Sequence, residues 1–432
     1  MSSLRPPKFY ELSPTARIET IIAQRDLSPS EAALLRQATG LSLQGADKMV
    51  ENVIGVFGLP LGLAQHFQVN GRDYVVPMAI EEPSVVASAS FAAKTVRAGG
   101  GFTTWSTERL MIGQIQVVGC PDPEVAEAAL LAARERLLIQ ADAFHPAMAE
   151  RGGGARDLEV RLIDDGTGAY GRMLIVHLLV DTQDAMGANT INTMVEGLAP
   201  EVERLTGGKV YLRILSNYTD RCLASAQCVI PAAALAHGRF TGPEVADGIV
   251  KAYALAAADP YRAVTHNKGV MNGIDAVVIA TGNDWRSVEA AAHAYAAREG
   301  RYTSLTQWSL DDAGNLVGRI TVPMAAGTVG GSIQANPMAK LALKLLAVSS
   351  ANELAEVIAA VGLAQNLAAL RALVTDGIQR GHMALHARSV ALSAGAEGDE
   401  VDVIAQRLVR LKEIKVSKAM ELLDELKQET VR

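Results

Sequence analysis

Four short segments of this chain carry ionisable side chains in surroundings that are otherwise uncharged and rich in glycine. Their central residues are Glu82, Lys268, Asp284 and His382. A charge that loses contact with water needs a partner or a function. Carboxylates, a lysine and a histidine in such settings therefore favour proton transfer and polarisation of a carbonyl group. The residue set predicts an enzyme.

Each of the first three residues also has an ordinary interpretation. Glu82 follows the apolar run 75–80 and precedes a proline, so it is expected to lose water and gain a raised pKa, as a proton donor requires; the alternative is an exposed acid at a helix start. For Lys268 the alternative is a solvated lysine in a loop. Asp284 follows the apolar stretch 276–280, which we interpret as a strand, and turn-forming aspartates are as common there as catalytic ones.

His382 and His386 lie four residues apart on an expected helix, a spacing that suits zinc. No third ligand follows in a recognisable pattern, and the glutamate of H-E-x-x-H is missing. We therefore expect no metal site. A histidine that protonates a leaving group is the alternative.

A small-residue turn, Asp184-Ala-Met-Gly-Ala-Asn189, follows the apolar strand expected at 173–180 and opens a helix. Backbone N–H groups and the helix dipole at such a turn suit a pyrophosphate. The segment is not the dinucleotide fingerprint G-x-G-x-x-G, so a plain capped helix start is the alternative. The glycine triplets at 99–101 and 152–154 are candidate phosphate loops or simple hinges.

Composition bounds the class of protein. The chain has 432 residues, of which 49% are hydrophobic, enough for two or three packed domains. A net charge of −7 and 4% aromatic residues argue against nucleic-acid binding. Three cysteines without a pairing pattern fit a reducing compartment. No signal peptide is expected, because residues 1–22 contain no apolar stretch. No membrane span is expected either, because the uncharged run 321–339 contains several Gly and Pro residues. We expect a cytoplasmic protein.

The expected elements are those of an α+β fold. Residues 13–50 read as helices, Asn70-Gly71 as a hairpin turn, and 84–98 as a helix of small residues. Between about 110 and 219 the order of elements is β-α-β-β-α-β, which is typical of the ferredoxin-like unit. Helices then dominate, with strands expected at 276–280, 303–310 and 316–322. The tail from about 376 to 432 reads as helical.

Taken together, the segments closely resemble the soluble bacterial class of 3-hydroxy-3-methylglutaryl-CoA (HMG-CoA) reductase. The resemblance covers nearly the whole chain. The matching stretches are Glu51-Asn-Val-Ile-Gly55, Glu81-Glu-Pro-Ser84, Asp184-Ala-Met-Gly-Ala-Asn-Thr190, Asp259-Pro-Tyr-Arg262, His266-Asn-Lys-Gly-Val-Met-Asn-Gly273, Ala280-Thr-Gly-Asn-Asp-Trp285, Gly330-Gly331 and Gly381-His-Met-Ala-Leu-His386.

The resemblance implies a reaction and a role for each catalytic residue. The family interconverts HMG-CoA and mevalonate by two hydride transfers, through mevaldyl-CoA and mevaldehyde. By this match Lys268 would stabilise the oxyanion, Glu82 would protonate it, and Asp284 would bridge the two. His382 would protonate the departing CoA thiolate.

The resemblance also implies ligand contacts. Substrate contacts would come from Ser84, Arg262, Thr265, Asn272 and Gln365. Contacts with the nicotinamide cofactor would come from His145, Asp184, Met186, Gly187, Ala188, Asn189 and Asn217.

The implied architecture has three parts. A large, helix-rich domain for substrate and CoA (1–109 and 220–375) is interrupted by a small ferredoxin-like cofactor domain (110–219). A helical C-terminal flap (376–432) carries the histidine. The family places its active sites between two subunits, so a homodimer is implied, with higher assemblies of dimers open.

Two departures from the family pattern concern its ligands. Tyr10 stands where relatives carry an arginine thought to touch CoA. His145 stands where NADH-specific relatives carry an aspartate, which favours NADPH or dual use, although Asp142 could take over the ribose contact. Two other functions stay open: a CoA-thioester lyase or acyltransferase without hydride transfer, and a regulatory small-molecule domain.

Overall fold

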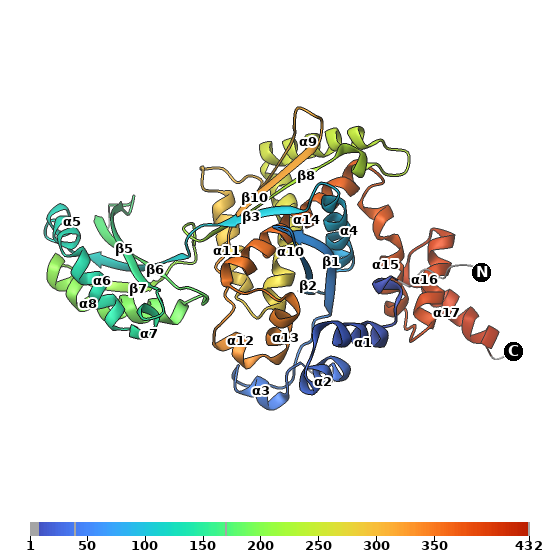
Figure 1. Ribbon diagram of the computed structural model, residues 1–432, viewed down its shortest axis with the longest axis horizontal. Helices are drawn as coiled ribbons and strands as arrows, with labels where there is room; N and C mark the ends of the chain where they lie inside the picture. Colours follow the sequence, from blue (N-terminus) through green and yellow to red (C-terminus); the bar gives the residue numbers. More distant parts are fainter. Residues whose placement is uncertain (1–7, 39, 169–170, 431–432) are drawn as a thin grey trace.

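The computed structural model describes residues 8–38, 40–168 and 171–430, with side chains left out at 378–385 and 428–430. It contains two sheets and a helical tail (Figure 1). The N-terminal segment is helical, as predicted. Its elements are a 3-10 turn at Phe9–Glu11, α1 (Pro14–Arg25), α2 (Pro29–Gln37) and α3 (Leu43–Asp47).

The larger sheet has six strands in the order β2-β1-β3-β8-β10-β9. The predicted hairpin is confirmed, because Asn70 and Gly71 both adopt positive φ angles (49° and 80°) between its first two strands. Two strands of this sheet, β3 and β8, were not anticipated from the sequence. The bounds are β1 (Leu61–Val69), β2 (Arg72–Ala79), β3 (Phe102–Ser106), β8 (Leu223–Ile230), β9 (Thr306–Leu310) and β10 (Leu316–Pro323).

Helices pack on this sheet and form the main core with it. They are α4 (Val85–Arg97), α9 (Gly242–Ala258), α10 (Pro260–Ala280), α11 (Trp285–Ala296), α13 (Pro337–Leu346) and α14 (Ala351–Val374), and the short α12 (Gly331–Ala335) packs on α13. Glycine lets α10 and α14 approach closely: a Cβ atom on Gly273 would lie 2.9 Å from Cβ of Gln365. This contact fixes where the two helices present their polar residues.

The stretch 276–280, predicted as a strand, is instead the last turn of α10. A short run of apolar residues does not distinguish a buried strand from a buried helix. The helix begins at Pro260, capped by Asp259, and most of its second half is buried on all sides. Lys268 consequently lies on a helix rather than in a loop.

The smaller sheet has the order β5-β6-β4-β7, with every neighbouring pair antiparallel. This is the strand order of the predicted β-α-β-β-α-β unit. Helices α5, α6 and α8 pack against it around a separate core, and the unit projects to the left of the larger body in Figure 1. The bounds are β4 (Leu110–Val118), α5 (Pro123–Ala132), α6 (Arg134–Ala143), α7 (Pro146–Ala149), β5 (Gly154–Asp164), β6 (Arg172–Asp181), α8 (Ala188–Thr206) and β7 (Lys209–Leu215).

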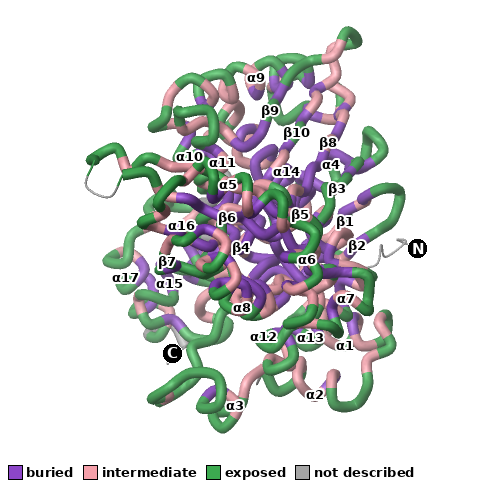
Figure 2. The backbone as a smooth tube through the Cα atoms, turned by 90° about the vertical axis from the view of Figure 1, so that its left-hand side faces the viewer, coloured by how far each residue is buried: buried purple, intermediate pink, exposed green. Residues whose placement is uncertain are grey.

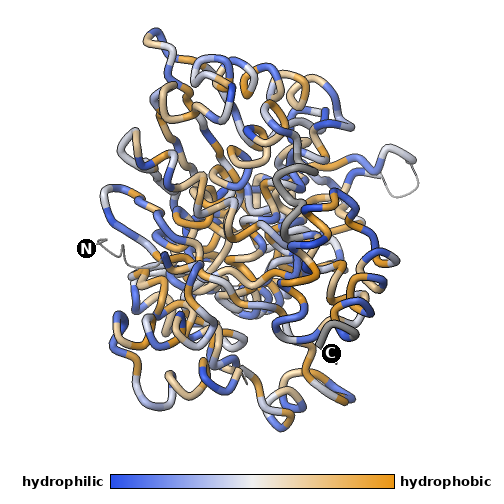
Figure 3. Tube along the Cα trace, turned by 90° about the vertical axis from the view of Figure 1, so that its right-hand side faces the viewer, coloured by the Kyte–Doolittle hydropathy of each residue, from blue (hydrophilic) through white to orange (hydrophobic). Residues whose placement is uncertain are grey.

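The C-terminal tail is helical, as predicted, and forms α15 (Ile378–Ser393), α16 (Glu400–Leu411) and α17 (Val416–Thr430). These helices bury a third small core of their own, which includes Val390, Ile404, Leu408 and Leu422. In Figure 2 buried segments gather in the middle of the view and exposed ones at its rim, and in Figure 3 hydrophobic and hydrophilic residues alternate along the outer helices. Among the described residues, the fold is thus a mixed α/β architecture with three larger hydrophobic cores and two small clusters beside the first of them.

One helix among the described residues, α14, is long and apolar enough to cross a membrane. Most of it is buried between the larger sheet and neighbouring helices, so it is a core helix here. The uncharged run 321–339 forms the end of β10, a loop, α12 and the start of α13.

Candidate active site

The structure brings Glu82 and Lys268 together. Glu82 lies in the bend between β2 and α4, and Lys268 lies on the exposed face of α10. Lys268 Nζ is 2.5 Å from Glu82 Oε2, and the two side chains are 59% and 40% exposed. An ammonium beside a carboxyl group is a geometry for stabilising an oxyanion and delivering a proton to it. Within one chain, however, the carboxyl group keeps more contact with water than the sequence led us to expect.

Two residues predicted to contact the substrate have a buried polar atom without a hydrogen-bond partner among the described residues. The atoms are Oγ of Ser84 and Oε1 of Gln365. Ser84 precedes α4 with a φ of 74°, a left-handed conformation that is strained for a residue with a side chain. Unsatisfied buried polar groups and local strain are both typical of ligand-binding sites.

The other predicted substrate contacts follow α10. Thr265, Lys268 and Asn272 are spaced by three and four residues, which places them along one side of the helix. Tyr261 and Val264 continue this side and are 89% and 53% exposed, an unusual position for apolar groups. Arg262 is half-buried at the start of the helix, and burial lowers the pKa of its guanidinium group.

The predicted cofactor turn adopts the expected place between β6 and α8. Gly187 has a φ of 84° and α8 begins at Ala188, while Met186 and Asn189 flank this start. The carboxylate of Asp184 accepts a 2.7 Å hydrogen bond from the backbone N–H of Ala351 at the start of α14. The turn is therefore anchored to the larger body.

Asp284 lies beside this turn rather than beside Lys268. Its carboxylate caps α11 by accepting from the backbone N–H groups of Arg286 and Ser287. The Ser287 hydroxyl in turn donates to Oδ1 of Asn217, 2.9 Å away. Asp284 and the predicted cofactor contact Asn217 thus belong to one hydrogen-bonded group.

A second connection joins the Asp284 turn to the cofactor turn. The side-chain amide of Asn283 exchanges two hydrogen bonds with the backbone of Gly327, at 2.7 and 3.0 Å. The loop after Gly327 donates backbone N–H groups to the carbonyl oxygen of Asp184. Sequence reasoning did not single out Asn283, although its position between Gly282 and Asp284 was a signal.

The chain therefore holds two separate groups of functional residues. Lys268 lies twelve residues before the end of α10, about 18 Å at the rise of an α-helix, and Asp284 follows that end. Among the described residues, no hydrogen bond or ion pair joins Asp284 to either Lys268 or Glu82. The predicted bridge by Asp284 is not made within one chain.

The position predicted to set cofactor choice lies at the start of α7. Nδ1 of His145 is buried without a hydrogen-bond partner among the described residues. Oδ1 of Asp142 already accepts a 2.7 Å bond from the backbone N–H of Ala155. The nearby acidic alternative is thus engaged in holding the start of β5.

The histidines predicted on the tail lie on α15. The side chain of His382 falls outside the described residues, whereas His386 is exposed. No group of three or more potential metal ligands occurs in the part of the chain that the structure describes.

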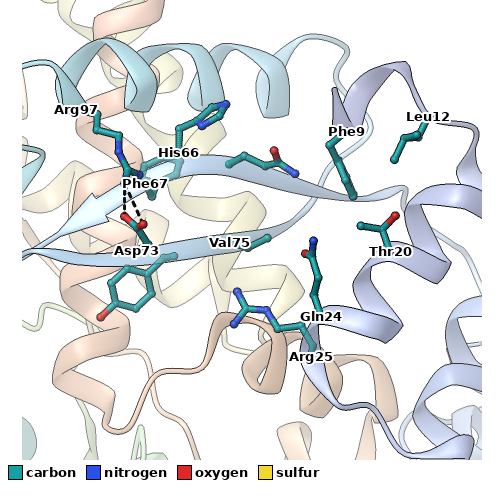
Figure 4. Close-up of a pocket in the computed structure, with 12 residues that line it drawn as sticks. Phe9, Leu12, Thr20, Gln24, Arg25, His66, Phe67, Asp73, Val75 and Arg97 are labelled. Atoms are coloured by element: carbon teal, nitrogen blue, oxygen red, sulfur yellow. Dashed lines mark hydrogen bonds and ion pairs between the residues drawn. The ribbon is translucent and has the colours of Figure 1, made fainter. Parts of the chain in front are cut away.

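A cavity of about 400 Å³ lies between α1, β1 and β2 (Figure 4). Two arginines line it, Arg25 and Arg97, the second of which pairs with Asp73 at 2.9 Å, and His66 lies beside them. His66 sits at an irregularity of β1 with a φ of 70°. Burial, then Lys94 and Arg97, lowers the pKa of His66. No motif in the sequence pointed to this cavity.

Residues 13–387 match the family model described as hydroxymethylglutaryl-coenzyme A reductase. The chain belongs to this family. It is 53% identical over 426 residues to the HMG-CoA reductase of Archaeoglobus fulgidus, a match that covers 98% of this chain and 95% of the relative. A probable HMG-CoA reductase of Borreliella burgdorferi is 34% identical over 385 residues, or 88% and 87% of the two chains.

Solved HMG-CoA reductases have the same fold. An enzyme from Streptococcus pneumoniae matches with a TM-score of 0.83 and 46% identity over 97% of this chain and 99% of its own. Another structure of the class II enzyme from that organism, bound to NADPH in open conformations, matches with a TM-score of 0.82 and 46% identity over 85% of this chain and 99% of its own. The fold class and the family resemblance inferred from the sequence are confirmed, and the reductase interpretation is supported over the lyase or acyltransferase.

Proposed function

We propose that this chain interconverts HMG-CoA and mevalonate plus CoA by two hydride transfers with NADPH. The observation that carries the proposal is the ion pair of Lys268 and Glu82 beside the unsatisfied Ser84 hydroxyl, in a chain of the reductase family. The test is absorbance at 340 nm with HMG-CoA and each nicotinamide cofactor, in both directions. Cleavage of HMG-CoA without a cofactor, and no change in absorbance, would instead support the lyase.

In this reaction Lys268 stabilises the negative charge that forms on the thioester oxygen as hydride arrives, and Glu82 in its acid form gives that oxygen a proton. Both groups already lie in contact, so little reorganisation is needed in the transition state. His382 then protonates the thiolate of CoA. NADPH supplies the hydride, and the turn at 184–189 with Asn217 holds its nicotinamide half.

The active site is completed by a second copy of the chain. Asp284 and the cofactor turn lie together but away from Lys268, whereas the side of α10 that carries Lys268 exposes Tyr261 and Val264. The segment 49–59 is also exposed, with Ile54 100% and Phe57 94% accessible. A homodimer would cover these apolar surfaces and place Asp284 of the partner subunit between Lys268 and Glu82.

The cationic cavity of Figure 4 suits the phosphate groups of the CoA half of the substrate. Helix α4 runs from Val85, directly after Ser84, to Arg97, thirteen residues or about 20 Å, and so connects the acyl site to this cavity. An extended thioester chain along α4 would put the phosphates near Arg25 and Arg97. Arg97→Ala should raise KM for HMG-CoA several-fold and leave turnover of free mevaldehyde unchanged, and equal effects on both would contradict this placement.

The three larger cores correspond to three functional parts. Residues 1–109 with 220–375 bind HMG-CoA, 110–219 bind the cofactor, and 376–432 form a flap that carries His382. The flap must admit two cofactor molecules in turn, so it has to open during turnover. Its own small hydrophobic core lets it move as a unit.

A further inference from the structure

A connected set of buried and partly buried polar side chains lies on the far side of α10 from the substrate. Asn267, immediately before Lys268, is completely buried. Its amide donates to the hydroxyl of Tyr302 at 3.0 Å and to the carbonyl oxygen of Thr303 at 2.9 Å, and accepts from the backbone N–H of Leu305 at 2.9 Å. The preceding residue, His266, is also buried, and its Nε2 is hydrogen-bonded to Oγ1 of Thr306 at 2.6 Å. This turn of α10 is therefore tied to 302–306.

The set continues from Tyr302 into α11. The Tyr302 hydroxyl lies 2.7 Å from Nδ1 of His293, and Nε2 of His293 lies 2.6 Å from the carboxylate of Glu289. Glu289 is also hydrogen-bonded to Asp275 of α10. Burial, followed by this bond, raises the pKa of Asp275 to about 9, so Asp275 is the protonated member of the pair.

When His293 is neutral, only one assignment of donors and acceptors is compatible with these hydrogen bonds. Asp275 O–H and His293 Nε2–H both donate to Glu289, Tyr302 O–H donates to Nδ1 of His293, and Asn267 N–H donates to Tyr302. Each of these hydrogens then has an acceptor. The required histidine tautomer is the one protonated at Nε2.

We propose that Tyr302 and His293 are positioning residues for Lys268, because they hold Asn267 and thereby the rotation of α10 about its axis. Residues 267 and 268 are successive on a helix, about 100° apart, so a small rotation at Asn267 moves the ammonium group away from Glu82. The effect acts on turnover more than on substrate binding. This inference rests on the role proposed above for Lys268.

The first test compares Tyr302→Phe with Tyr253→Phe. Tyr253 is a half-buried tyrosine of α9 whose hydroxyl has no hydrogen-bond partner among the described residues. Tyr302→Phe should lower kcat about tenfold, the effect of one buried hydrogen bond, with KM for HMG-CoA within about twofold. Tyr253→Phe should leave both unchanged. An unchanged kcat in Tyr302→Phe would overturn the proposal.

The second test uses the assignment of donors and acceptors at position 293. A glutamine at position 293 can accept from Tyr302 and donate to Glu289, whereas leucine can do neither. His293→Gln should therefore retain most of the turnover that His293→Leu loses. Equal losses would contradict the proposal.

The third test does not depend on activity. Glu289 raises the pKa of His293 through their hydrogen bond, so the tautomer is measured by nitrogen NMR at about pH 8.5, well above the usual histidine value. We expect the Nε2–H form in the wild type and a mixture in Tyr302→Phe, with His293→Gln identifying the signal. The Nδ1–H form in the wild type would overturn the network. Absence of turnover in the wild type would contradict the role proposed for Lys268. The NMR spectrum would then still show whether the hydrogen-bonded network exists, so the two failures are distinguished.

Discussion

Lys268 and Glu82 are 186 positions apart in the sequence, yet Nζ of the lysine lies 2.5 Å from Oε2 of the glutamate. The first residue comes from the exposed side of a long helix and the second from the bend that follows a buried strand. This contact is the part of the proposed catalytic machinery that one chain assembles by itself.

Replacing the lysine should remove most of the catalysis. Lys268→Ala should lower turnover of HMG-CoA by at least on the order of 10²-fold, the usual cost of losing one preorganised group that stabilises an oxyanion. The measurement is steady-state oxidation of NADPH, with circular dichroism to verify folding. A variant with a nearly normal rate would exclude Lys268 from this role.

The role of His382 can be separated from the hydride transfers. A thiolate needs a proton to leave, whereas free mevaldehyde has no thiolate to release. His382→Gln should therefore cripple reduction of HMG-CoA and largely spare reduction of mevaldehyde. His386→Gln, on the same helix, is the matched control and should affect neither reaction strongly. If His382→Gln lowers both rates equally, the histidine does not act on the leaving group.

Cofactor choice should follow from position 145. An acidic residue beside the adenosine ribose binds its 2′-hydroxyl and repels a 2′-phosphate, and His145 cannot do so. Asp142 is engaged with the backbone of Ala155. We expect NADPH to be used at least as well as NADH, and His145→Asp to shift the ratio of kcat/KM toward NADH by about tenfold, or about 1.4 kcal/mol. A strong preference of the wild type for NADH would contradict this account.

The partly buried pair of Asp275 and Glu289 should make stability depend on pH. The folded state raises the pKa of Asp275 from 3.8 to about 9. At intermediate pH the folded protein keeps a proton on Asp275 that the unfolded chain has released. The stability that Asp275 contributes is therefore complete below the pKa of the unfolded chain and is lost as the pH rises through the raised pKa of the folded state. The pKa of Glu289 is lowered, first by its hydrogen bond with His293, so the stability that Glu289 contributes is lost as the pH falls through that lowered pKa.

Asp275→Asn cannot titrate but still donates to Glu289. The midpoint of thermal unfolding of the wild type should therefore fall more steeply between about pH 5 and 8 than that of the variant. Differential scanning calorimetry across this range is the measurement. Parallel curves for the two proteins would show that Asp275 does not carry the buried proton.

The sequence predicted much of this architecture for identifiable reasons. Asn70-Gly71 predicted its hairpin because few residues tolerate two consecutive left-handed conformations, and the alternation of elements predicted the smaller sheet. The stretch 276–280 was assigned wrongly because a fully buried helix has no polar face to reveal its period.

The limits at the site were of another kind. Asp284 was placed correctly at a turn, but only the structure shows that it caps α11 and lies on the cofactor side, away from Lys268. His266 and Asn267 were noticed as part of a motif, whereas their burial against 302–306 depends on tertiary packing. Neither the cationic cavity nor the polar set behind α10 has a local pattern in the sequence.

In the proposed homodimer, each active site combines Lys268 and Glu82 of one subunit with Asp284 of the partner subunit. Co-expression of differently tagged Lys268→Ala and Asp284→Ala chains, followed by tandem purification, isolates a mixed dimer in which one site carries both changes and the other carries neither. Two inactive parents should then yield a dimer with about half of the wild-type activity, since a twofold dimer has two equivalent sites. The matched control, a mixed dimer of Lys268→Ala and Glu82→Gln, should stay inactive because each site loses one residue. A Lys268→Ala and Asp284→Ala mixed dimer as inactive as its parents would contradict the shared site.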